Sequence, residues 1–196
     1  GETLPITNLP NTYESQYVDT LVLNAGMNAG VTTYTFSLED QDGNVVEREI
    51  NVTVANSLSI EKTGSFYHIA GSLQGSWDLV NDVLVAVGGS ANAKDLQNTD
   101  VAGAPFTGSF NAANATVFVK SNGYDYANAN TATAWTAFTA GSVLTTVSNP
   151  AVGDIYIAKI RGGSDYVVLK ITAKDIADNT CGCLNKGKLT FTYKKN

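Results

Sequence analysis

The strongest constraint on this chain is the alternation of apolar and polar residues over two segments joined by a short polar turn. Aromatic and aliphatic residues alternate with Thr and Ser in Thr32–Leu38, and Val and Ile alternate with polar residues in Val45–Val54. A period of two places alternate side chains on opposite faces of an extended strand. Asp40–Asn44, between the two segments, holds the Asp and Gly residues that favour a tight turn. The pattern predicts a β-hairpin with one apolar face.

The same strand pattern extends along most of the chain, which predicts an all-β fold. The further predicted strands are Tyr17–Leu23, Phe66–Leu73, Trp77–Leu79, Val83–Val87, Thr116–Val119, Asp154–Ile160, Tyr166–Thr172 and Lys188–Tyr193. One Ala-rich segment near 127–140 departs from this period and predicts a helix that ends at Gly141. Trp135 and Phe138 are three residues apart in it, so we expect both on its buried face.

Charge divides the chain into two parts near residue 56. Residues 1–56 hold eight acidic residues and one basic residue, whereas residues 57–196 hold ten acidic and eleven basic residues. Two or three strands with a single apolar face do not shield that face by themselves. We therefore expect the 1–56 unit to pack against the 57–196 domain or against the same segment of a second molecule. The short Ala55–Ser57 link favours the second arrangement, a homodimer through residues 1–56.

Two segments resemble known proteins. Thr33–Val54 looks like the last two strands of the Ig-like modules of bacterial surface proteins. Trp77–Leu96 and the closing segments Asp154–Thr172 and Gly187–Lys195 are similar to secreted Bacteroidetes surface lipoproteins of unassigned function, and loosely to the haemophore lipoproteins of that group. The resemblance implies a partial Ig-like unit over 1–56, followed by a β-sandwich-like domain over 57–196 with one helical insertion. It also implies an extracellular or cell-surface protein with an export signal and lipid anchor upstream of Gly1.

Composition excludes several functions. The net charge of −6 and a charged fraction of 15% disfavour nucleic acids as partners. No apolar run approaches the roughly 18 residues of a membrane-spanning helix, so membrane contact is expected only through the anchor. The resemblance to haemophores implies two axial histidines for haem, and His68 is the only histidine. No cofactor is therefore expected.

The candidate ligand-binding residues are Tyr124, Tyr126, Asp125 and His68. Aromatic rings beside planar polar groups suit a carbohydrate, because its apolar faces stack on rings while its hydroxyls form hydrogen bonds. His68 also reads as an ordinary strand histidine. Trp135 and Phe138 belong to the same aromatic set, but as the buried stripe of the helix they leave Tyr124 and Tyr126 as the exposed candidates.

Two weaker alternatives concern metals. Asp40 and Asp42 resemble the start of a calcium loop, but the positions that require Gly and Glu hold Val45 and Asn51, so a hairpin turn is favoured. Cys181 and Cys183 could chelate a soft metal, although a closed zinc site needs two further ligands. Free or disulfide-bonded loop cysteines are the favoured interpretation.

No motif for catalysis is present, and the acidic residues of the second part are scattered singly. We expect a non-catalytic extracellular surface module that binds an unidentified ligand or partner protein. The alternatives are a purely structural spacer or adhesion scaffold, and carbohydrate- or haem-related binding.

Overall fold

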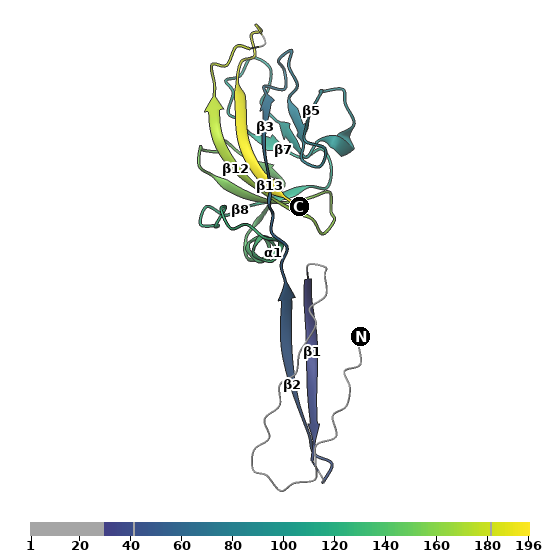
Figure 1. Ribbon diagram of the computed structural model, residues 1–196. Helices are drawn as coiled ribbons and strands as arrows, with labels where there is room; N and C mark the ends of the chain where they lie inside the picture. The colour runs from purple at the N-terminus through teal and green to yellow at the C-terminus, as the bar shows by residue number, and fades with distance from the viewer. Residues whose placement is uncertain (1–29, 41, 181) are drawn as a thin grey trace.

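The computed structural model describes residues 30–40, 42–180 and 182–196. Within these residues the backbone forms three antiparallel sheets and a single α-helix, which confirms the all-β fold class. One sheet is a two-stranded hairpin, and the other two form a sandwich-like domain. The hairpin projects from one end of this domain (Figure 1). The predicted strand Tyr17–Leu23 lies outside the described residues.

The hairpin consists of β1 (Gly30–Glu39) and β2 (Val45–Val54), as the sequence predicts. Its turn is held by Asp40, whose carboxylate accepts hydrogen bonds from the backbone N–H (2.8 Å) and side-chain amide (2.8 Å) of Asn44. Gly43 has φ +82°, a left-handed conformation that glycine adopts without strain. The polar residues between the strands therefore form the hairpin turn.

The sandwich-like domain contains a six-stranded sheet, ordered β3-β13-β12-β11-β8-β9, and a five-stranded sheet, ordered β10-β7-β6-β4-β5. The strands of the six-stranded sheet are β3 (Ile60–Tyr67), β8 (Val117–Lys120), β9 (Val143–Leu144), β11 (Ile155–Lys159), β12 (Tyr166–Asp175) and β13 (Lys188–Lys195). The strands of the five-stranded sheet are β4 (Ser76–Asp78), β5 (Val83–Val85), β6 (Leu96–Asn98), β7 (Phe110–Asn111) and β10 (Thr146–Val147). A 3-10 turn, Ala91–Ala93, lies between β5 and β6.

The main hydrophobic core lies between these two sheets. Phe110 and Phe118 meet edge to face with ring centroids 5.3 Å apart. On β13 the alternate residues Leu189, Phe191 and Tyr193 are fully buried, as their period of two predicts. Burying a side chain of this size contributes roughly 1.5–3 kcal/mol. The aromatic side chains therefore hold the two sheets together.

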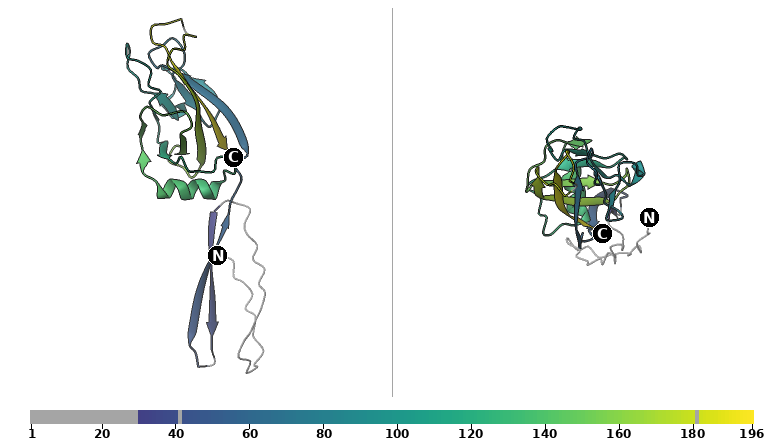
Figure 2. Two further views of the ribbon diagram at one scale, coloured as in Figure 1. Left: turned by 90° about the vertical axis from the view of Figure 1, so that its left-hand side faces the viewer. Right: turned by 90° about the horizontal axis from the view of Figure 1, so that it is seen from above.

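A second core lies on the other face of the six-stranded sheet, under the helix α1 (Thr131–Ala140). Phe138 of the helix packs there with Ile157 and Val168 of the sheet, and all three are buried. Figure 2 shows the helix lying across the end of the domain from which the hairpin projects. The central strand β11 is covered on both faces, which explains its nearly continuous apolar sequence.

The helix differs from the prediction in its start and in one of its buried residues. It begins at Thr131, because the side chain of Asn130 caps its first turn by accepting a backbone hydrogen bond. Ala134 and Phe138, four residues apart, are its buried residues. Trp135 is 50% exposed, so the prediction that it lies on the buried face is wrong. It is one position, about 100° around the helix, from Ala134.

The hairpin is joined to the domain by hydrogen bonds at the start of the helix, one of them to a side-chain hydroxyl. The Asn56 N–H donates to the Thr131 hydroxyl (3.0 Å), and the Thr131 N–H donates to the Asn56 carbonyl (2.9 Å). Leu58 is buried, and its N–H donates to the Ala129 carbonyl (3.0 Å). The predicted link Ala55–Ser57 therefore lies where the chain leaves the hairpin and enters the domain.

Two predicted strands end early. The strand predicted over Phe66–Leu73 shares only Phe66 and Tyr67 with β3, which runs over Ile60–Tyr67; the chain turns after Tyr67, where the Gly71 N–H donates to the His68 carbonyl (2.9 Å). Strand β5 likewise ends before the predicted Val87.

Candidate functional site

The hairpin separates apolar from polar side chains onto its two faces. We call the face formed by Tyr34, Phe36, Leu38, Val46, Ile50 and Val52 the apolar face. Tyr34 lies opposite Ile50, and Leu38 lies opposite Val46. Three of these side chains are largely in solvent, with exposed fractions of 64% for Leu38, 53% for Val46 and 50% for Ile50. Exposed apolar side chains gathered along one face in this way are typical of an interaction surface.

The polar face carries the hairpin's acidic residues that lie on the strands. Its members are Val31, Thr33, Thr35, Ser37, Glu39, Val45, Glu47, Glu49, Asn51 and Thr53, so two exposed valines lie near its ends. The Thr33 hydroxyl donates a hydrogen bond to the Asn51 side chain (2.7 Å) across the strands. At the tip, hydrogen bonds from Asn44 lower the pKa of Asp40. Arg48 has the opposite charge and lies in the row of the apolar face, opposite Phe36.

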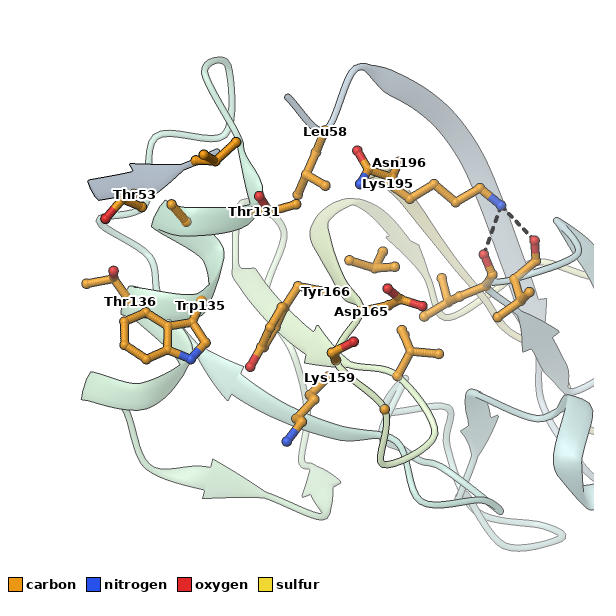
Figure 3. Close-up of a pocket in the computed structure, with 18 of the residues that line it drawn as sticks. Thr53, Leu58, Thr131, Trp135, Thr136, Lys159, Asp165, Tyr166, Lys195 and Asn196 are labelled. Carbon is orange, nitrogen blue, oxygen red and sulfur yellow. Dashed lines mark hydrogen bonds between the residues drawn. The ribbon is translucent and has the colours of Figure 1, made fainter. Parts of the chain in front are cut away.

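A cavity of about 880 Å³ lies where the hairpin meets the domain. Its wall is formed by the end of the hairpin, α1, the turn between β11 and β12, and the end of β13 (Figure 3). Trp135 of α1 and Tyr166 of β12 provide its aromatic surface. The Tyr166 ring packs on Phe138 with centroids 5.5 Å apart, and burial raises the pKa of Tyr166. The second core therefore supports the Tyr166 part of this aromatic surface.

The sequence-predicted residues Tyr124, Tyr126 and Asp125 lie beside the helix but do not line this cavity. Tyr124 forms a hydrogen bond with Thr133 on the first turn of α1 (2.8 Å). Asp125 holds its own loop, because its carboxylate accepts hydrogen bonds from the backbone N–H (3.2 Å) and side-chain amide (2.7 Å) of Asn128; these bonds lower its pKa.

Tyr126 lies against the six-stranded sheet. The ammonium groups of Lys194 and Lys170 lie over its ring, 5.2 and 5.8 Å from the centroid. Burial raises the pKa of Tyr126 to about 12. This ring therefore contacts two lysines of the sheet.

His68 is separated from the tyrosines by most of a strand. It is fully buried beyond the end of β3, its Nδ1 accepts a hydrogen bond from the Ala70 N–H (3.1 Å), and its ring lies 6.1 Å from that of Phe106. That end of β3 pairs with Lys188, whereas Tyr126 contacts Lys194, about 20 Å away along the same strand. The structure does not bring His68 and the tyrosines into one site.

The residues considered as weak metal candidates that the structure describes have other structural roles. Asp40 holds the hairpin turn, in which the Asp42 N–H donates to its carboxylate (2.9 Å). Cys183 is in a disulfide, and Cys181 lies outside the described residues. No group of three or more His, Cys, Asp or Glu residues in the described part of the chain is arranged to hold a metal ion.

An ion cluster that the sequence did not reveal links the two sheets. Arg161, in the turn after β11, donates to both carboxylate oxygens of Asp95 (2.9 and 2.8 Å) and to Asp78 (2.8 Å). Both carboxylates are buried. Arg161 has φ +51° and Gly162 φ +70°, so the turn aims the guanidinium at them. The only local signal was the Arg-Gly-Gly turn itself.

Comparison with known proteins adds no relative. No protein-family model, no curated protein and no solved structure matches the chain. No helix in the described residues is long and apolar enough to cross a membrane.

Proposed function

We propose that the chain is a non-catalytic surface module that binds a partner through the apolar face of its hairpin, the partner being the same face of a second copy. The observation that carries this proposal is the exposure of Leu38, Val46 and Ile50 on one side of a two-stranded sheet. A sheet with one apolar face reaches a stable state by packing that face on another element. Two hairpins packed face to face provide the second layer of a sandwich.

The distribution of charge favours packing face to face over pairing edge to edge. In the face-to-face arrangement, Glu47 and Glu49 point outward, away from the second copy. Arg48 is then the cation nearest the contact, and Phe36 of the second copy offers a ring to it. The acidic hairpins thus associate without burying their carboxylates.

The size of the face sets the expected strength. Strands of ten residues give a face about 33 Å long and 10 Å wide. A stable interface buries about 800 Å² on each partner, so the dimer is expected to be weak and concentration-dependent.

The non-catalytic part of the proposal is supported by the domain's acidic residues. Asp78 and Asp95 bind Arg161, and the Asp154 carboxylate accepts hydrogen bonds from Lys120 (2.8 Å). These three carboxylates hold turns and sheets in place and do not line the cavity, whose acidic side chain is that of Asp165.

A cell-surface location with an upstream lipid anchor belongs to the same proposal. The disulfide at Cys183 supports it, because such bonds persist in oxidising compartments. The alternative is a spacer without a ligand site. The presence of the cavity argues against that alternative.

Light scattering over a range of protein concentrations tests the interface. Ile50→Asp places a charge on the apolar face. Asn51→Asp places the same charge at the next position of the strand, on the polar face. We expect the wild type and Asn51→Asp to dimerise as concentration rises, and Ile50→Asp to stay monomeric. Circular dichroism verifies that both variants fold. Equal association of the two variants, or a wild type that is monomeric throughout, would refute the proposal.

A further inference from the structure

We infer that the cavity at the base of the hairpin is a binding site for a neutral saccharide, with Trp135 as its stacking surface. This site is separate from the apolar face and does not depend on the proposed dimer.

The first observation is the exposure of Trp135. The helix satisfies its packing on the sheet with Ala134 and Phe138, so the indole of Trp135 is not needed in the core. It is instead 50% exposed and lines the cavity (Figure 3). Val31 and Val80, also on the wall, are 54% and 47% exposed. An aromatic ring beside aliphatic groups suits the C–H face of a sugar ring.

The second observation is the polar part of the wall. Thr136 and Ser164 bring hydroxyl groups, and Asn196 brings an amide, to the same cavity. Groups of this kind match sugar hydroxyls, since each can donate and accept hydrogen bonds. A purely aliphatic ligand would leave them unpaired, at a cost in free energy.

The third observation is the balance of charge. Lys159 and Asp165 contribute one charge of each sign to the wall. Lys195 also lines the cavity, but its ammonium is already bound by the Leu79 carbonyl (3.1 Å) and by Asp82 (2.6 Å). The cavity therefore favours neither an anion nor a cation, which selects a neutral ligand.

The fourth observation is that the site is built before the ligand arrives. Phe138 supports Tyr166, the Asn130 side chain caps α1, and the paired hydrogen bonds between Asn56 and Thr131 fix the hairpin end against the helix. Preformed sites lose little entropy on binding. A volume of about 880 Å³ lies within the range of typical ligand sites, roughly 300–1,000 Å³.

Titration of the whole chain with cellohexaose, maltohexaose and mannohexaose tests the inference, by calorimetry and by intrinsic fluorescence. The chain has two tryptophans, and Trp77 is buried, so a change in emission reports Trp135. We expect at least one oligosaccharide to bind and to shift the emission. Trp135→Ala should weaken that binding about tenfold or more, and Trp135→Phe should restore part of it.

Val143→Ala is the matched control, since Val143 is 55% exposed and lies outside the cavity. It should leave binding unchanged. Three outcomes would overturn the inference: no binding by any of the three oligosaccharides, equal binding by Trp135→Ala and the wild type, or Trp135-dependent binding only to a proline-rich peptide added as a fourth probe. The last result would assign the cavity to a peptide.

Discussion

At the scale of single residues, Asp154 is a carboxylate kept ionised by its neighbours. Burial by itself raises its pKa, but hydrogen bonds from Lys120 (2.8 Å), the Ala151 N–H (2.9 Å), Asn122 (2.9 Å) and Tyr156 (3.0 Å) outweigh burial and lower the pKa to about 2. The ordinary pKa of an aspartate is about 3.9. The ionised form of Asp154 therefore stabilises the fold.

The pKa of Asp154 predicts a loss of stability in acid. Because its folded pKa lies below its unfolded pKa, its contribution is present above about pH 4 and is lost as the pH falls toward 2. The expected loss is about 1–2 kcal/mol, after allowing for the exposure of Lys120. Denaturant unfolding of the wild type and Asp154→Asn at pH 5, 4, 3 and 2 measures it. The variant should lose less stability over this range, and curves of equal slope would contradict the assignment.

Residue pairs of this kind were beyond sequence reasoning. Asp95 and Arg161 are separated by 66 residues, and Lys120 and Asp154 by 34. No local spacing in the sequence therefore indicates these ion pairs. A turn motif such as Asp40–Asn44 is different, because Asp40 bonds groups only two to four residues away. Local chemistry was therefore predictable, whereas buried ion pairs depend on how distant strands meet.

At the scale of elements, the helix α1 carries one packed and one exposed aromatic side chain, three residues apart. Phe138→Ala should lower the free energy of unfolding by about 3 kcal/mol or more, because it leaves a cavity in the second core. Trp135→Ala should lower it by less than about 1 kcal/mol, because half of the indole is already in solvent. Chemical denaturation compares them. Equal losses would mean that Trp135 also belongs to the core.

The strands were better predicted than the face of this helix. A period of two is unambiguous in β13, where Leu189, Phe191 and Tyr193 are all buried. In the helix, Trp135 pairs with Phe138 at a spacing of three, and Ala134 pairs with Phe138 at a spacing of four, and both spacings lie on one helical face. Ala134, the smaller of the two residues, is the one that packs on the sheet with Phe138, and only the packed structure reveals this choice.

At the scale of the whole molecule, the sequence predicted that the hairpin cannot shield its apolar face, and the described hairpin leaves Leu38, Val46 and Ile50 exposed. The cavity was not predictable. Its walls come from the hairpin end, α1 and the end of β13, segments far apart in the chain. The predicted ligand residues flanked the helix in sequence, whereas the structure lines the cavity with Trp135 and Tyr166 from two separate elements.

The central claim, that the apolar face is an interface between copies, is tested most directly by amide hydrogen exchange at several protein concentrations. The exchange rates of residues 31–54 are compared with those of β11 and β12, which belong to the domain. Dimerisation predicts that exchange in the hairpin slows as concentration rises, while exchange in β11 and β12 stays constant. Hairpin exchange that is the same at every concentration would contradict the claim.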